Sequence, residues 1–167
     1  MINELDNYSK TPEFKFAVID GLGDDFIPTK GSSHAAGWDA KITENIFIKE
    51  YETALISLGI RCYCPSGWWL EVRPRSSAFL KKNLHFLYGV VDSDYEGIIS
   101  AVVQYIPIPS IKTSNILKLE KGERIAQLIP HKVNEIIVKS ISNEEYNILC
   151  KQRGLTRGTG GFGSSGK

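Results

Sequence analysis

Cysteine is scarce in this sequence, and neither sign of charge is in excess. Three cysteines among 167 residues are an odd number without disulfide-framework spacing, so we expect reduced thiols in a cytoplasmic protein. Twenty basic and nineteen acidic residues leave a formal net charge of +1, too weak a field to recruit nucleic acid or an anionic membrane. No apolar run is long enough to cross a bilayer, and the first residues do not form a signal peptide. Any anion must therefore be bound at a local site.

The sequence also shows no spacing typical of a metal site and no residue set typical of an activated nucleophile. Cys62 and Cys64 are two residues apart and have no matching second pair, whereas zinc sites usually leave two or more residues between paired cysteines. The three histidines, His34, His85 and His131, are scattered along the chain. No Ser–His–acid or Cys–His set is evident, so we assign the histidines no catalytic role.

Helical periodicity is scarce as well, and short apolar or alternating runs take its place. Turn residues separate these runs, a pattern typical of an all-β sandwich or barrel. We expect strands over residues 14–19, 46–48, 60–64, 69–73, 98–105, 124–129 and 135–138.

Two segments carry helix signals. Ser142 to Glu145 fits a capping box and predicts one short helix that runs through Leu149. Residues 76–83 could form another turn or two. We expect one domain over residues 1–153, and residues 154–167 as a separate tail.

The tail, RGTGGFGSSGK from Arg157, has too little apolar surface to fold alone. Five glycines among the last ten residues would make it flexible. An arginine, a phenylalanine and several hydroxyls among those glycines are suited to hold phosphates and cover a flat base. The tail is therefore either a lid that orders over a nucleotide or a plain flexible end.

The segment from Gly89 to Gly97 has the turn residues of a surface hairpin, but it also carries an unusual pair of side chains. Tyr95 follows Asp92 by three residues, which sets a flat ring beside a carboxylate. In a functional hairpin the backbone edges would bond a base, Tyr95 would pack under a sugar, and Asp92 would polarise a water. A plain surface hairpin is the alternative.

Three further places offer polar groups. The turn over residues 73–77 has two arginines and two serines, and could bind phosphate or simply cap a helix. Gln127 lies in an apolar run, where a buried amide either props up backbone or faces a site. Small residues precede Asp39, so it either enters a cleft at a close subunit approach or forms a turn.

In order along the chain, five segments resemble the five motifs of the trimeric dUTPases. They are AAGWDA from Ala35, PRSSAFLKKN from Pro74, GVVDSDYEG from Gly89, GERIAQL from Gly122 and RGTGGFGSSG from Arg157. Each motif is weak alone, but five in the right order are specific. The pair of serines followed by Phe79 is more similar to phage and Gram-positive members.

The resemblance implies a β-jelly-roll fold and a homotrimer whose active sites lie between subunits. It implies hydrolysis of dUTP to dUMP and pyrophosphate by attack of water at the α-phosphorus, which controls the dUTP/dTTP balance and supplies dUMP. Mg²⁺ would be bound mainly by the three phosphates, which suits a hard ion that keeps its waters.

By the same resemblance, Asp92 and Gln127 are the catalytic residues, the first activating water and the second holding it with the α-phosphate. Tyr95 lies beneath the deoxyribose and excludes a 2′-hydroxyl. Asp39 meets the water shell of Mg²⁺. The other substrate-binding residues implied are Arg75, Ser76, Ser77, Leu87, Gly89, Val90, Val91, Arg157, Phe162, Gly163, Ser164 and Ser165.

Within that set, the backbone around Leu87 to Val91 would read uracil and reject the thymine methyl. Arg75 and Ser76 would contact phosphates. The tail of one subunit would close a neighbour's site, with Arg157 on the γ-phosphate, Phe162 on uracil, and the two serines on phosphate.

Some features depart from the family pattern, and other functions remain open. Ser77 replaces a common glycine, Ile98 a common acid and Trp38 a common tyrosine, and residues 51–58 look like an excursion outside the core. A dCTP deaminase would need an acid on the strand after the hairpin, and residues 98–105 contain none. A non-catalytic nucleotide sensor and a purely structural jelly roll are the remaining alternatives.

Overall fold

The computed structural model describes residues 11–108 and 115–154. The chain divides into two compact units, residues 1–134 and residues 135–167. This division falls ahead of the boundary expected at Gly154, which stays a prediction. None of the described helices is long and apolar enough to span a membrane.

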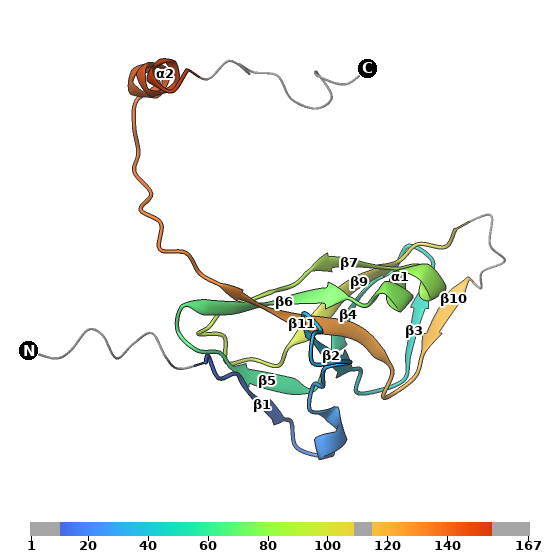
Figure 1. The fold of residues 1–167 in the computed structure, drawn as a ribbon. Coiled ribbons are helices and arrows are strands. Elements are labelled where there is room, and N and C mark those ends of the chain that lie inside the picture. The colour runs from blue at the N-terminus through green and yellow to red at the C-terminus, as the bar shows by residue number, and fades with distance from the viewer. Residues whose placement is uncertain (1–10, 109–114, 155–167) are drawn as a thin grey trace, which may run out of the picture. The chain divides into compact units, whose positions relative to one another are not determined.

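The first unit is a jelly-roll-like β fold, as the sequence predicts (Figure 1). Its strands pair in four antiparallel sheets, ordered β1-β5, β10-β3, β2-β11-β6-β8 and β4-β9-β7. The described strands are β1 (Lys15–Val18), β2 (Trp38–Lys41), β3 (Ile46–Lys49), β4 (Thr53–Ser57), β5 (Ile60–Tyr63), β6 (Trp68–Pro74), β7 (Leu84–Tyr88), β8 (Val90–Val91), β9 (Ser100–Tyr105), β10 (Ile116–Leu119) and β11 (Arg124–Lys132).

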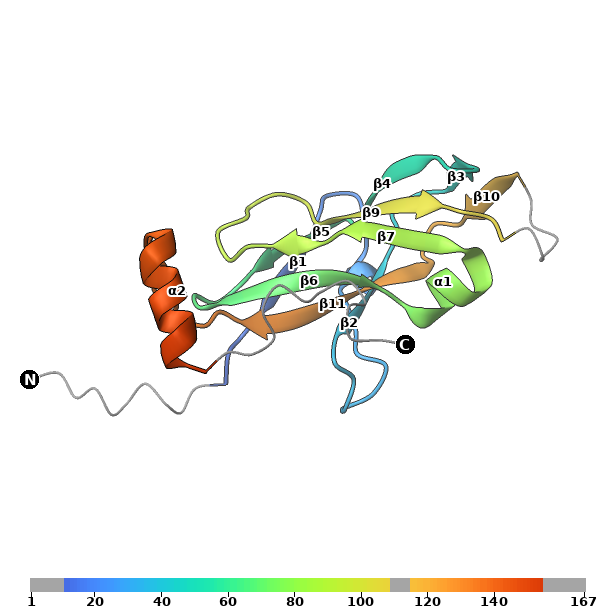
Figure 2. The same ribbon diagram turned by 90° about the horizontal axis from the view of Figure 1, so that it is seen from above.

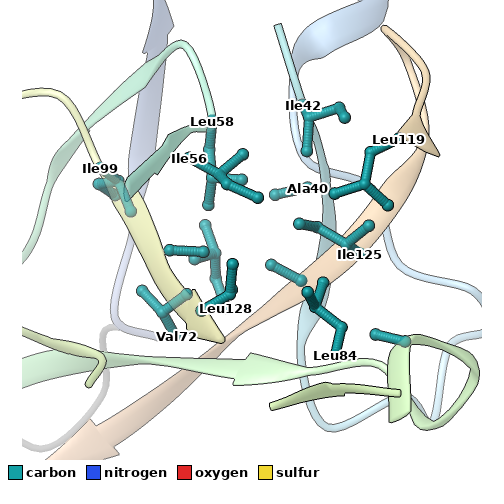
Figure 3. Close-up of a cluster of buried hydrophobic side chains, with 14 of the residues drawn as sticks. Ala40, Ile42, Ile56, Leu58, Val72, Leu84, Ile99, Leu119, Ile125 and Leu128 are labelled. Carbon is teal, nitrogen blue, oxygen red and sulfur yellow. The ribbon is translucent and has the colours of Figure 1, made fainter. Parts of the chain in front are cut away.

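The core lies between the sheets, because alternate residues of the strands point inward. On β9 the buried positions are Ala101, Val103 and Tyr105, with half-buried residues between them. Strands from distant parts of the sequence contribute to one cluster (Figure 3). Its members include Ala40, Ile42, Ile56, Leu58, Val72, Leu84, Ile99, Leu119, Ile125 and Leu128.

Two short α-helices and one 3₁₀-helix (Asp24–Phe26) are described. The sequence predicts one short helix from Ser142 and a further turn or two over residues 76–83. Helix α1 (Ser76–Lys82) ends at Asn83, whose left-handed backbone (φ 53°) lets its N–H bond the helix carbonyls. Helix α2 (Asn143–Gln152), in the second unit, begins as expected. The Ser142 hydroxyl accepts from the Glu145 amide at 3.1 Å.

The strand expected over residues 135–138 is wrong. The segment forms no described strand, and Ile136, Ile137 and Val138 are 77%, 83% and 91% exposed. Apolar alternation predicts a strand only when a partner edge is at hand, and within the described residues of this chain none pairs with it. The other six expected runs each contain a strand.

The stretch 51–58, expected as a family-specific excursion from the standard core, is part of the packed fold of this chain. Strand β4 pairs with β9 from Thr53 opposite Gln104 to Ser57 opposite Ser100. Ile56 and Leu58 are fully buried. Within the strand only Ile56 is buried, while its neighbour Leu55 is exposed.

Ile56→Ala should lower the free energy of unfolding by about 2–5 kcal/mol, because the truncated side chain leaves a cavity in the core. Leu55→Ala on the same strand is the matched control. Leu55 is exposed, so its truncation should change that free energy by less than about 0.5 kcal/mol. Denaturant unfolding followed by circular dichroism measures both, and equal losses would contradict the assignment of β4 to the core.

Candidate functional site

The hairpin from β7 to β8 is held against β6 by a close backbone approach. The Val72 amide donates to the Gly89 carbonyl at 2.6 Å. A Cβ atom at Gly89 would clash with the carbonyl oxygen of Val72. Only glycine therefore lets the hairpin lie this close to β6.

Tyr95 is seated by a second glycine of the same segment. Its amide donates to the Asp92 carbonyl at 3.2 Å, and its hydroxyl donates to the Ile98 carbonyl at 3.2 Å. A Cβ atom at Gly97 would clash with the Tyr95 ring. The ring thus lies over Gly97 while about half of the residue (47%) stays exposed, which leaves it available to a ligand.

A cavity of about 300 Å³ opens beside this hairpin. That volume lies at the small end of the range for ligand pockets. Residues of β4 and β9, including Leu55 and Val102, form the facing wall. Five residues expected at the site line it together, namely Gly89, Val90, Val91, Asp92 and Tyr95. The lining does not include Leu87, which is exposed.

The second group of expected residues lies where β6 ends and α1 begins. The Arg75 amide donates to the Ile125 carbonyl at 2.9 Å, and the Gln127 side-chain amide donates to the Pro74 carbonyl at 3.0 Å. Both bonds join this corner to strand β11, which therefore holds it in place. Ser76 is exposed and Ser77 half-buried, so Ser76 can reach a ligand.

Asp39 lies within strand β2 and not in a turn. It pairs in register with Gln127 of β11, which pairs in turn with Arg73 of β6. These side chains share the face of the sheet opposite to the buried Ala126 and Leu128.

The close approach expected around Asp39 is made to β11 of the same chain. A Cβ atom at Gly37 would clash with the Leu128 carbonyl. The Asp39 carboxylate pairs with Arg75, with Nε 3.1 Å from Oδ1, and Asp39 is only 14% exposed. The sequence did not indicate this pairing, because the two residues are far apart along the chain.

The hairpin pocket and this corner, which is formed by Asp39, Arg75, Ser76 and Gln127, are separate within one chain. Among the described residues, none of those four lines the pocket. Arg157, Phe162, Gly163, Ser164 and Ser165 of the tail lie outside the described residues. The described part of the chain thus presents two separate clusters.

The described residues contain no group of three or more His, Cys, Asp or Glu that could hold a metal ion. The second Asp39 oxygen, Oδ2, has no described bond to Arg75. A carboxylate so placed fits contact with a metal-bound water better than direct ligation of Mg²⁺.

The cysteines Cys62, Cys64 and Cys150 are free, and none of them lines the pocket beside the hairpin. Burial, with a smaller contribution from Cys64, raises the pKa of the Cys62 thiol to about 12, and burial also raises the pKa of Cys64. Both thiols stay protonated at neutral pH, so neither is an activated nucleophile.

The fold and the two clusters define an all-β protein with a ligand pocket on a hairpin and a polar corner beside it. The sequence model of the dUTPase family matches residues 25–166. The chain belongs to the dUTPase family.

Named relatives agree with this assignment. The deoxyuridine 5′-triphosphate nucleotidohydrolase of Candida albicans is 34% identical over 84% of this chain and 81% of its own length. That of Paramecium bursaria Chlorella virus 1 is 32% identical over 83% of this chain and 89% of its own.

Solved structures share the fold with this chain. The dUTPase of Streptococcus mutans has a TM-score of 0.65 and 30% identity, covering 74% of this chain and 98% of that one. A mutant dUTPase of phage phi11 of S. aureus, which coordinates a structural Mg(II) ion, has a TM-score of 0.68 and 18% identity, covering 80% and 99%. Similar folds thus include Gram-positive and phage proteins.

Gly89→Ala should destabilise the protein by about 1–3 kcal/mol, because the added methyl forces the hairpin away from β6. Nucleotide affinity should fall with it. Gly31→Ala is the matched control, since a Cβ there meets no atom within 4 Å. Thermal denaturation and nucleotide titration measure the two effects, and a Gly89→Ala protein that matches Gly31→Ala in both would refute the close approach.

Proposed function

We propose that this protein hydrolyses dUTP to dUMP and pyrophosphate. Membership of the dUTPase family supports the activity. The observation that carries the mechanism is the lining of one cavity by Asp92, Tyr95 and the backbone of residues 89–91. This combination sets a carboxylate at the edge of a pocket that an aromatic ring also lines.

The hairpin selects the nucleoside. The backbone edge of Gly89 to Val91 bonds uracil, and its closeness to the base leaves no room for the thymine methyl. Tyr95 packs under the deoxyribose, where its ring leaves no space for a 2′-hydroxyl. The hydrogen bond from its hydroxyl to Ile98 supports this role by holding the ring in place.

The corner holds the phosphates. Arg75 supplies charge-assisted hydrogen bonds, and Ser76 and Ser77 supply hydroxyls. Gln127 donates to the α-phosphate through the second hydrogen of its amide nitrogen, the first of which bonds Pro74, and its amide oxygen accepts from the attacking water. Leu87 contributes only backbone, in keeping with its side chain outside the pocket lining.

Asp92 acts as the general base. Its carboxylate accepts a proton from the attacking water, whose oxygen forms a bond to the α-phosphorus. The bond from that phosphorus to the bridging oxygen breaks, and pyrophosphate leaves with the electron pair. Mg²⁺, when bound to the three phosphates, supplies charge neutralisation. Asp39 would contact a water bound to this ion.

The complete site is shared between protomers of a homotrimer. The separation of the pocket from the corner within one chain supports this arrangement. So does the exposed apolar row of Ile136, Ile137 and Val138, which a monomer would leave in water. The tail from residue 154 closes over a neighbour's site through Arg157, Phe162, Gly163, Ser164 and Ser165.

Nothing favours the alternative functions. Strand β9 carries no acid that could act as the base in cytosine deamination. Asp92 is exposed, and a nucleotide sensor without catalytic activity would not need its carboxylate. The cytoplasmic location expected from the thiols stays a prediction. A pyrophosphate-release assay across dUTP, dCTP, dTTP and UTP, with and without Mg²⁺, tests the substrate. An ammonia assay with dCTP tests deamination.

Asp92→Asn should lower kcat by about 10²–10⁴-fold, because the amide cannot accept the proton from water. Affinity for a non-hydrolysable dUTP analogue should be kept. Asp94→Asn is the matched control, since Asp94 is exposed, lies two residues away and does not line this pocket. Turnover by Asp92→Asn near that of the control would remove Asp92 from the mechanism.

A further inference from the structure

The ion pair between Asp39 and Arg75 joins β2 to the start of α1 at the polar corner. Nε of Arg75 lies 3.1 Å from Oδ1 of Asp39. Nη1 of Arg75 donates to the Arg124 carbonyl at 3.4 Å. The carboxylate is 14% exposed and the arginine side chain 36% exposed, so water screens this pair less than a pair on the open surface.

These two contacts leave part of the guanidinium unused. An arginine has five N–H donors in a rigid planar fork. Asp39 takes the Nε hydrogen, and Arg124 takes one on Nη1. Within the part of the chain that the structure describes, no bond uses the hydrogens on Nη2. That edge can meet an anion without breaking either contact.

The backbone beneath Arg75 is fixed independently of Asp39. The bonds from the Arg75 amide to Ile125 and from Gln127 to Pro74 hold the corner on β11. The side chain is different, because a free arginine has about 2 kcal/mol of rotamer entropy to lose on binding. A partner that orders the guanidinium in advance removes part of this cost before the ligand arrives.

We propose that Asp39 is a positioning residue that holds Arg75 with its Nη2 edge directed to the substrate phosphates. The inference rests on the proposed function, which supplies the phosphate ligand. It differs from contact with the water shell of Mg²⁺, because here Asp39 acts through an arginine.

Charge makes the two effects of Asp39 opposite in sign. A carboxylate beside a polyphosphate repels it, so removing the charge alone would strengthen phosphate binding. If positioning dominates, Asp39→Ala weakens binding despite the lost repulsion. Asp39→Asn keeps an oxygen that can accept from Nε, so it retains most of the effect.

Asp39→Ala should lower kcat/KM for dUTP at saturating Mg²⁺ by about tenfold, the scale of one charge-assisted hydrogen bond. Asp39→Asn should lose much less. In an Arg75→Lys background, Asp39→Ala should cause no further loss, since lysine has no Nε–H to hold. Because Asp39 also meets the water shell of Mg²⁺, the Mg²⁺ concentration for half-maximal activity should rise, but the loss in kcat/KM should persist at saturating Mg²⁺.

Asp25→Asn is the matched control. It breaks the 2.8 Å pair between Asp25 and Lys41, which involves neither Asp39 nor Arg75, and should leave kcat/KM unchanged. The positioning role would be overturned by a loss on Asp39→Ala that adds fully to that of Arg75→Lys. A loss that disappears at saturating Mg²⁺ would overturn it as well.

A second measurement does not depend on activity. The Nε–H signal of Arg75 in a ¹H–¹⁵N spectrum, assigned by its loss in Arg75→Lys, should be visible in the unliganded protein and in Asp25→Asn. It should broaden or vanish in Asp39→Ala. If the wild-type protein fails to hydrolyse dUTP, the proposed function fails while this signal still tests the pair. An unchanged signal in Asp39→Ala refutes the inference.

Discussion

The pairing of β11 with β2 on one side and β6 on the other is the constraint on which the polar corner depends. Register on β11 sets Gln127 opposite both Asp39 and Arg73. The same strand supplies the carbonyl of Ile125, which holds the Arg75 backbone. These strands lie side by side in both views (Figures 1 and 2). A slip of one residue would turn every polar side chain of β11 into the core.

The hairpin pocket depends on a different constraint, namely two places where a glycine lets another part of the chain come close to its backbone. Gly89 lets the hairpin touch Val72, and Gly97 makes room for the Tyr95 ring. Together these contacts bring Asp92 and Tyr95 to one cavity. The two glycines of this motif are needed because they have no Cβ atom, whereas Asp92 and Tyr95 are needed for the carboxylate and the ring that they bring to the pocket.

Prediction from the sequence was strongest where a feature depends on residues close together in the chain. The hairpin residues and the Ser142 cap follow from short-range patterns, and the structure brings five of the expected pocket residues together. It was weakest for the half-exposed strand β4, whose apolar residues do not alternate with polar ones and include the exposed Leu55. The run at 135–138 failed for the opposite reason, because a strong apolar pattern finds no described partner strand in its own chain.

The family, the all-β class and the residue types of the candidate site can be predicted from the sequence, because ordered motifs and turn chemistry are local properties of the chain. The pairing of Asp39 with Arg75 and the separation of the pocket from the corner within one chain are seen in the folded structure alone. Strand register creates these relations between residues far apart in the chain, and register follows from the packing of the whole core.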